Sequence, residues 1–155
     1  MIIKHFNLKA YQDKKMSFYL LYGQNIGLIE ETIKNIIKPK FSNNIYYYDE
    51  TEILADEDGF KERIYNKSFF ENDKLIIINR GTDKIFDVIN EQTEKKIEDI
   101  KIIIKSGVLE KKSKLRNFFE KDKQLIIIPF YEDNYQSLIT LVQNFCGEKK
   151  IKISI

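Results

Sequence analysis

The 155-residue sequence is poor in the residues that build disulfides and metal sites. Cys146 is its only cysteine and His5 its only histidine. A single cysteine excludes a disulfide within the chain, and the simplest setting for such a protein is a reducing cytoplasm. One thiol and one imidazole also provide no ligand cluster for zinc or another transition metal. We therefore expect a cytoplasmic protein without a bound metal.

The sequence also lacks long apolar runs and a strong net charge. Charged residues interrupt each apolar run before it reaches the ~20 residues that span a bilayer. The N-terminus around Lys4 and His5 has no apolar signal-peptide core, so we expect no association with membranes. The formal net charge is only +2. The net charge therefore gives no indication of nucleic acid binding, although it does not exclude a local basic patch.

Apolar and charged residues are both abundant, at 43% and 32% of the chain, which fits one soluble domain of this length. Five short apolar runs predict strands at 18–22, 45–48, 75–78, 102–104 and 125–128. Three of them are continuous β-branched or leucine stretches without polar alternation, as expected of central strands covered on both faces.

Segments with helical spacing of apolar residues separate these runs. They predict five helices. The first spans 28–37 and is ended by Pro39, and the second spans about 56–66. The third follows an N-cap at Thr82, the fourth lies around Phe118, and the fifth runs from about Leu138 to a stop at Gly147. Strands that alternate with helices predict right-handed crossovers and a three-layer α/β fold with a mainly parallel, five-stranded sheet.

The first predicted strand, loop and helix have the layout of a phosphate-binding P-loop, G-x-x-x-x-G-K-[ST]. The loop spans 23–27 and contains Gly23 and Gly27. With Gly23 at the first glycine, the motif's final Gly, Lys and Ser/Thr fall on Leu28, Ile29 and Glu30. The lysine binds the β- and γ-phosphates and the hydroxyl holds Mg²⁺, and neither isoleucine nor glutamate can do this. We interpret these five residues as a degenerate phosphate loop that does not bind nucleotide.

A second catalytic element is also missing. An NTPase of this architecture needs an acidic residue at the end of its third strand to organise Mg²⁺, and here 75–78 runs into Asn79 and Arg80. The same two strand ends lack the carboxylates of a phospho-receiver domain. We therefore expect no catalytic residues and no cofactor.

Two segments are candidates for binding a macromolecule. The first carries Lys111, Lys112, Lys114 and Arg116. Its simpler interpretation is a solvated start of a helix, and the alternative is a contact to a phosphate backbone or to a neighbouring subunit. No aromatic residue is interleaved with these cations, which disfavours a surface for stacking single-stranded bases.

The second candidate is Ser68-Phe69-Phe70, in the polar link between the second predicted helix and the third strand. Adjacent side chains point about 100° apart in a helix and about 180° apart in a strand, so at least one ring is expected to be exposed. Core packing is the simpler interpretation. The alternative is an aromatic anchor for a partner's pocket, because such anchors dominate binding energy.

The order and spacing of these segments resemble the N-terminal part of the delta subunit of the bacterial DNA polymerase III clamp loader. The resemblance runs through 18–23 and 28–31, then 68–70 before 75–78, and resumes in 109–116 and 128–133. It covers nearly the whole chain. The chain departs from the family at Pro129 and Phe130, where members often have cysteine, and at Phe69, where leucine is commoner.

The resemblance implies an AAA+-like domain that has lost its functional Walker motifs. It implies a non-catalytic role in DNA replication, within a holoenzyme that is a DNA-directed DNA polymerase. Ser68, Phe69 and Phe70 would form a hydrophobic plug that binds the sliding clamp (the beta subunit) and promotes its opening. Other clamp-loader subunits would be partners of the full-length protein, and DNA would be contacted only indirectly or weakly.

Family members continue into a lid domain and a helical collar domain. The resemblance therefore implies an AAA+-like domain at 1–147 and the start of a truncated lid domain at 148–155, where 151–155 alternate apolar and polar residues. An edge strand of the same domain is the alternative for this end. Two other functions also stay open, a nucleotide-binding NTPase domain with a divergent phosphate loop and an adaptor domain with an unknown partner.

Overall fold

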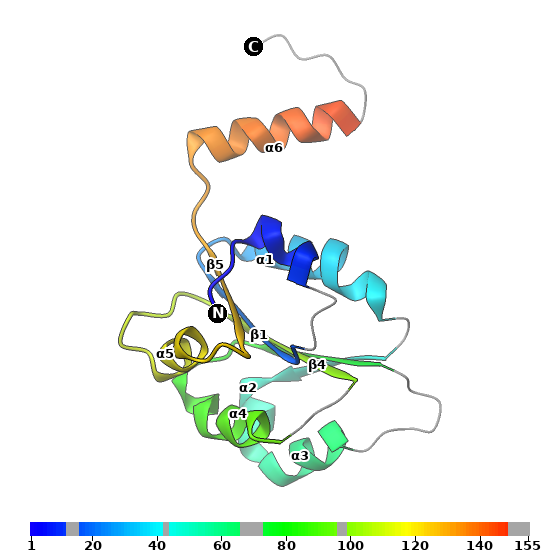
Figure 1. Cartoon of the computed structure of the whole chain (residues 1–155), viewed down its shortest axis with the longest axis vertical. Helices are drawn as coiled ribbons and strands as arrows, with labels where there is room; N and C mark the ends of the chain where they lie inside the picture. Colours follow the sequence, from blue (N-terminus) through cyan, green and yellow to red (C-terminus); the bar gives the residue numbers. More distant parts are fainter. Residues whose placement is uncertain (12–15, 42–43, 66–72, 96–98, 149–155) are drawn as a thin grey trace.

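In a computed structural model, the residues described are 1–11, 16–41, 44–65, 73–95 and 99–148. Within them, five strands form one sheet in the order β2-β3-β4-β1-β5, and each neighbouring pair is parallel (Figure 1). The strands are β1 (Phe18–Gly23), β2 (Ile45–Asp49), β3 (Lys74–Asn79), β4 (Ile100–Ser106) and β5 (Ile126–Phe130). The expected α/β fold with a parallel, five-stranded sheet is confirmed.

Continuous apolar runs form the middle of this sheet because both of its faces are covered. One row of side chains shows the register: Ile77 pairs with Ile103, Ile103 with Tyr19, and Tyr19 with Ile126. All four residues are buried. These side chains therefore form one continuous buried layer across the four neighbouring strands β3, β4, β1 and β5.

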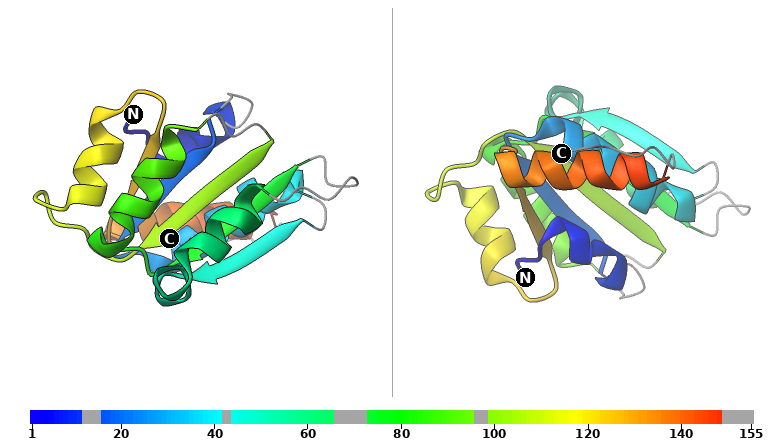
Figure 2. Two further views of the ribbon diagram at one scale, coloured as in Figure 1. Left: turned by 90° about the horizontal axis from the view of Figure 1, so that it is seen from below. Right: turned by 90° about the horizontal axis from the view of Figure 1, so that it is seen from above.

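Helices cover both faces of the sheet, as the views in Figures 1 and 2 show. On one face lie the 3₁₀ helix η1 (His5–Tyr11), α1 (Ile26–Thr32), the π-helical η2 (Ile33–Ile37) and the 3₁₀ helix η3 (Lys38–Lys40). On the other lie α2 (Glu50–Ala55), α3 (Glu57–Tyr65), η4 (Asp83–Ile85), α4 (Phe86–Thr93) and α5 (Lys114–Lys121). The core consists of two apolar layers, one on each side of the sheet.

Most predicted helices are present, with boundaries that local contacts explain. The first begins at Ile26, two residues before the predicted start, because the Asn25 side chain caps it. Thr82 is an N-cap as predicted, since its side chain accepts a hydrogen bond from the Lys84 amide.

Three elements, η1, η3 and α2, were not predicted. Their signal in the sequence is weak, because η1 and α2 each bury only one apolar side chain, Leu8 and Ile53, and η3 buries none. The prediction that Pro39 ends the first helix is wrong, because Pro39 lies inside η3, near its start, where its missing amide costs no hydrogen bond.

The last helix, α6 (Tyr135–Glu148), differs from the prediction at its end. Gly147 lies within the helix and does not stop it, because it does not adopt the left-handed conformation of a helix-ending glycine. Figure 1 shows α6 beyond α1, joined to β5 by an extended link. Residues 149–155, on which the predicted lid domain depends, lie outside the described residues. No helix in the described part of the chain is long and apolar enough to cross a membrane.

Candidate functional site

The predicted phosphate loop and the predicted basic segment lie at one edge of the sheet. All strands are parallel, so the link after β1 and the link after β4 both leave the carboxyl edge, and β1 and β4 are neighbours. Helix α1 follows β1 onto one face and α5 follows β4 onto the other. Ligands of open α/β sheets bind where the chain diverges in this way. A hydrogen bond of 3.1 Å from the Gly23 amide to the Gly107 carbonyl joins the two links.

Most backbone amides of the β1–α1 link have acceptors within the chain. A working phosphate loop directs such amides at the ligand. Here the Gln24 amide donates to the Phe130 carbonyl (3.0 Å), and the Leu28 amide donates to Asn25 Oδ1 (3.0 Å). The Ile26 and Ile29 amides donate to the carbonyls of Gln24 and Asn25, at 2.9 and 3.1 Å. A phosphate at this link would have to displace these bonds.

Asn25 has a second contact, which connects the β1–α1 link to the segment after β5. Its Nδ2 donates to Asp133 Oδ2 at 2.8 Å, and the other oxygen of Asp133 accepts from the Ser137 hydroxyl at 3.0 Å. A carboxylate of the chain itself therefore lies beside the predicted phosphate loop. Its negative charge would repel a phosphate.

Gly23 has a structural reason to be glycine. Its φ is +139°, and a Cβ atom at this position would lie 1.9 Å from the Phe130 carbonyl oxygen. Strand β1 thus approaches the backbone of β5 too closely for any side chain. The glycine that the motif requires is explained here by the packing of two strands, without a phosphate.

The other four positions of the degenerate loop are dispersed. Gly27 lies in α1, where a Cβ atom would meet only the Asn25 side chain, at 3.8 Å. Leu28 is half-buried, and Ile29, at the motif's lysine position, is buried in the core beneath α1. Glu30 is exposed and forms an ion pair with Lys105 of β4. The structure therefore does not bring the side chains of 28–30 together around one point.

The end of β3 carries a cation. Arg80 has a φ of 58° and pairs with Asp49, at the end of the neighbouring strand β2, with 2.6 Å between Nη2 and Oδ2. Burial alone would raise the pKa of Asp49, but hydrogen bonds from Arg80 and Thr51 lower it. Sequence reasoning missed this pair because it depends on β2 lying beside β3. No group of three metal-binding side chains occurs among the residues that the structure describes.

The basic segment divides into two parts. Lys111, Lys112 and Lys114 are exposed, and Lys112 forms an ion pair of 3.0 Å with Glu110. Arg116 is half-buried instead. Its guanidinium bonds to Glu120 (2.8 Å) and to the Leu109 carbonyl (3.0 Å), and lies 5.2 Å from the centre of the Tyr22 ring.

These contacts give the two parts different surroundings. The hydrogen bond to Glu120 raises the pKa of Arg116 against the effect of burial. Three lysines thus face solvent at the carboxyl edge, while Arg116 packs onto the end of β1.

The predicted plug, Ser68-Phe69-Phe70, lies outside the described residues. Its two ends are described, because α3 ends at Tyr65 and β3 begins at Lys74. The start of β3 is at the amino edge of the sheet. The residue at which the described chain resumes into β3 thus lies at the edge opposite to the degenerate phosphate loop.

Comparison with known proteins identifies the fold. No family model and no curated protein matches the chain. Among solved structures, the DNA clamp loader delta protein of Bacillus subtilis matches with a TM-score of 0.67 over 94% of this chain, at 16% sequence identity. The fold is that of a clamp-loader subunit. A DNA polymerase III gamma subunit-related protein of Thermotoga maritima also matches, with a TM-score of 0.56 over 93% of the chain and 12% identity.

The clamp-loader likeness is one of fold, because both identities are low. This chain spans 48% of the delta protein and 52% of the gamma-related protein, about half of each. The resemblance seen in the sequence is thus confirmed as a resemblance of structure.

Proposed function

We propose that this chain is a non-catalytic clamp-loader domain of the delta type, which binds the DNA sliding clamp through Ser68, Phe69 and Phe70. The observation that carries the proposal is the clamp-loader fold, which extends over 94% of the chain, together with a β1–α1 link whose amides bond within the chain. A clamp-loader fold whose β1–α1 link has isoleucine and glutamate at the positions of the motif's lysine and hydroxyl supports a subunit that acts by binding.

The alternative, an NTPase domain with a divergent phosphate loop, is disfavoured by the same link. A divergent site needs donors and a cation that face the nucleotide. At this link the amides of Gln24, Ile26 and Leu28 bond within the chain and Ile29 is buried. The Asp133 carboxylate, bonded to Asn25, adds a negative charge beside the link.

The plug hypothesis has a direct energetic consequence. Burial of an exposed phenyl ring in a partner's pocket contributes roughly 1.5–3 kcal/mol, and such anchors dominate affinity. The double substitution Phe69→Ala and Phe70→Ala should therefore weaken clamp binding by about 2–5 kcal/mol, which is roughly 30-fold to several thousand-fold. If the two rings belong to the core, the same substitutions should cost roughly 3–5 kcal/mol of folding stability.

Surface plasmon resonance with the cognate clamp and thermal unfolding, both on the double mutant, separate these outcomes. Phe6→Ala is the matched control, because the Phe6 ring is exposed on η1 and belongs to neither candidate site. Intact stability with lost clamp binding supports the plug. Collapsed stability or unchanged binding rejects it. Opening of the ring is measured separately, as the rate at which the chain releases clamps from nicked circular DNA.

A further inference from the structure

The two outer strands of the sheet differ in how their free sides are covered. At β5, the first residues of the chain pair with the strand: the Ile3 amide donates to the Ile127 carbonyl at 3.0 Å, and the Ile127 amide donates to the Met1 carbonyl at 3.1 Å. At the other side, β2 pairs only with β3 among the described strands, and Figure 2 shows it as an outermost strand. The free side of β5 is therefore closed by the chain itself, and that of β2 is open.

The register of β2 shows which of its main-chain groups point away from the sheet. Ile45 is aligned with Leu75, whose amide donates to the Asn44 carbonyl at 2.9 Å. Main-chain groups alternate in direction along a strand. The even-numbered residues of β2 therefore bond to β3, and Ile45 and Tyr47 direct their amides and carbonyls outward. No hydrogen-bond partner for these four outward groups occurs in the described part of the chain.

Unpaired amides and carbonyls of this kind are a template for a further strand. Lysine and proline commonly protect such a strand, and neither residue occurs in β2. The template ends at Asp49, because the Asp49 amide already donates to Glu52 Oε2 at 2.8 Å. It therefore consists of two outward-bonding residues, Ile45 and Tyr47, with Tyr46 between them.

The side chains of the two outward-bonding residues lie on the same face of the sheet. Tyr47 is 53% exposed, and Lys38 Nζ lies 5.2 Å from the centre of its ring. Ile45 is half-buried against the apolar layer on this face. An aromatic residue directly opposite a β-branched residue is one of the pairs that stabilise neighbouring strands. Ile45 and Tyr47 are thus complementary to each other when they meet on two different strands.

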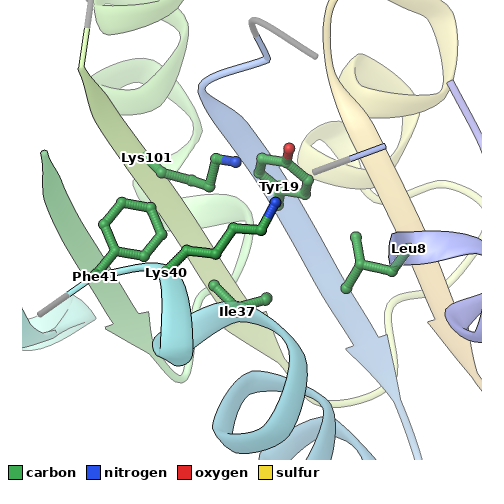
Figure 3. A pocket seen from close by; sticks show the side chains of 6 residues that line it. All are labelled: Leu8, Tyr19, Ile37, Lys40, Phe41 and Lys101. Atoms are coloured by element: carbon green, nitrogen blue, oxygen red, sulfur yellow. The ribbon is translucent and has the colours of Figure 1, made fainter. Parts of the chain in front are cut away.

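A cavity in the same covering layer has no room for a side chain of a partner. It lies between Tyr19, Ile37 and Phe41 (Figure 3) and has a volume of about 10 Å³, which is space for about one water molecule. Binding of a partner at this side of the molecule therefore depends on the main chain of β2 and not on an apolar pocket.

We propose that β2 pairs with β2 of a second copy of this chain, antiparallel and about a two-fold axis at Tyr46. Residues opposite each other in an antiparallel pair exchange both main-chain hydrogen bonds at alternate positions. With the axis at Tyr46, Ile45 of each copy lies opposite Tyr47 of the other. All four outward groups of each copy are then bonded, and the aromatic–aliphatic pair forms twice. A two-fold axis makes this match automatic, because each copy presents the same surface to the other.

The charges around β2 are compatible with this contact. The strand has one charged residue, Asp49, and its carboxylate pairs with Arg80 at 2.6 Å. The formal net charge of the whole chain is only +2. Charge of one sign is a common means of keeping identical strands apart, and here that repulsion is small.

Sedimentation equilibrium of the 155-residue chain tests the proposal. The contact of one strand pair is smaller than the ~1,200 Å² of a standard stable interface, so the dimer is weak and forms at high concentration. Measurements from about 10 µM to about 1 mM cover the affinities expected of such a contact. We expect the mean mass to rise reversibly toward that of a dimer. A chain that stays monomeric over this range overturns the proposal and leaves β2 to a strand of another protein. The experiment uses neither clamp nor nucleotide, so its result is independent of the proposed function.

Tyr47→Lys is the principal variant, because it places a charge at the centre of the contact, beside Lys38. The dissociation constant of the dimer should rise at least about tenfold. Tyr131→Lys is the matched control, since Tyr131 is an exposed tyrosine beyond the end of β5, and it should leave the dimer unchanged. Val142→Lys tests the exposed surface of α6 as a competing interface. An unchanged dimer in Tyr47→Lys, or an equal loss in either other variant, overturns the proposal.

Cysteine cross-linking tests the position of the axis, in a background in which Cys146→Ser removes the natural thiol. Tyr46→Cys places two thiols on the axis, where the Cα atoms of an antiparallel pair lie about 4.5 Å apart, within the range that a disulfide spans. Tyr47→Cys places its two thiols off the axis. We expect mild oxidation to give a covalent dimer of Tyr46→Cys and little of Tyr47→Cys. A covalent dimer of Tyr47→Cys alone, or of neither variant, overturns this pairing. Circular dichroism checks that both variants fold, and if Tyr46→Cys does not, the comparison of the lysine variants decides.

Discussion

Substitution of Gly23 tests whether this glycine serves the fold or a ligand. The close approach of β1 and β5 leaves 1.9 Å between a Cβ atom at position 23 and the Phe130 carbonyl oxygen. The obstructing atom belongs to the backbone of a paired strand, so it cannot move aside as a flexible side chain would. Gly23→Ala should therefore destabilise the protein even in buffer that contains no nucleotide.

The expected cost of Gly23→Ala has two parts. A residue other than glycine at a sparsely populated positive φ costs on the order of 1–3 kcal/mol. Forcing an extra carbon into a packed contact costs about 1–3 kcal/mol more, through shifts of the backbone. We expect a total loss of about 2–6 kcal/mol, which for a domain of this size corresponds to a melting temperature lower by roughly 5–20 °C.

Urea unfolding followed by circular dichroism measures this loss. Gly107→Ala is the matched control, because Gly107 lies at the same edge of the sheet and a Cβ atom there would meet nothing within 4 Å. The free energy of unfolding of the control should lie within about 0.5 kcal/mol of that of the parent. It could be slightly higher than the parent's because alanine restricts the unfolded chain. If Gly23→Ala is as stable as the parent, or if Gly107→Ala loses as much, the explanation of Gly23 by strand packing is wrong.

Three further predictions concern the nucleotide site, the basic segment and the start of α5. Calorimetric titration with Mg-ATP should show no binding, because amides of the β1–α1 link donate to acceptors within the chain and Ile29 is buried. Saturable micromolar binding with turnover would contradict this prediction. Replacement of Lys111, Lys112 and Lys114 by alanine should weaken clamp binding less than tenfold, because charges at a rim mainly tune association rate and salt dependence; complete loss in a folded variant would place the interface elsewhere. Burial alone would raise the pKa of Asp83, but hydrogen bonds from Ser113 and from the Leu115 and Lys114 amides lower it below its ordinary 3.8. Its stabilising effect should thus be present above pH ~4 and lost as the pH falls through the lowered pKa. Urea midpoints of the parent and of Asp83→Asn should converge in that acid range, and a constant difference would exclude Asp83 as the cause.

The sequence alone determined the class of fold and the defect of the phosphate loop. A parallel strand covered on both faces must be apolar along its length, so the runs at 75–78 and 102–104 identify central strands without any knowledge of their neighbours. The sequence also shows directly that positions 29 and 30 carry isoleucine and glutamate where the phosphate-binding motif has lysine and a hydroxyl residue. The hypothesis that 68–70 forms a clamp-binding plug also arose from the sequence, and it stays a prediction.

Only the tertiary structure decided how residues far apart in the sequence combine. The reason for Gly23 is the carbonyl of Phe130, and the partner of Asn25 is Asp133, 108 positions further along the chain. Glu30 of α1 likewise forms its ion pair with Lys105 of β4. These contacts follow from the strand order β4-β1-β5, which is set by the packing of whole layers. Local spacing of apolar residues carries no information about that order, because any permutation of the strands would bury the same runs.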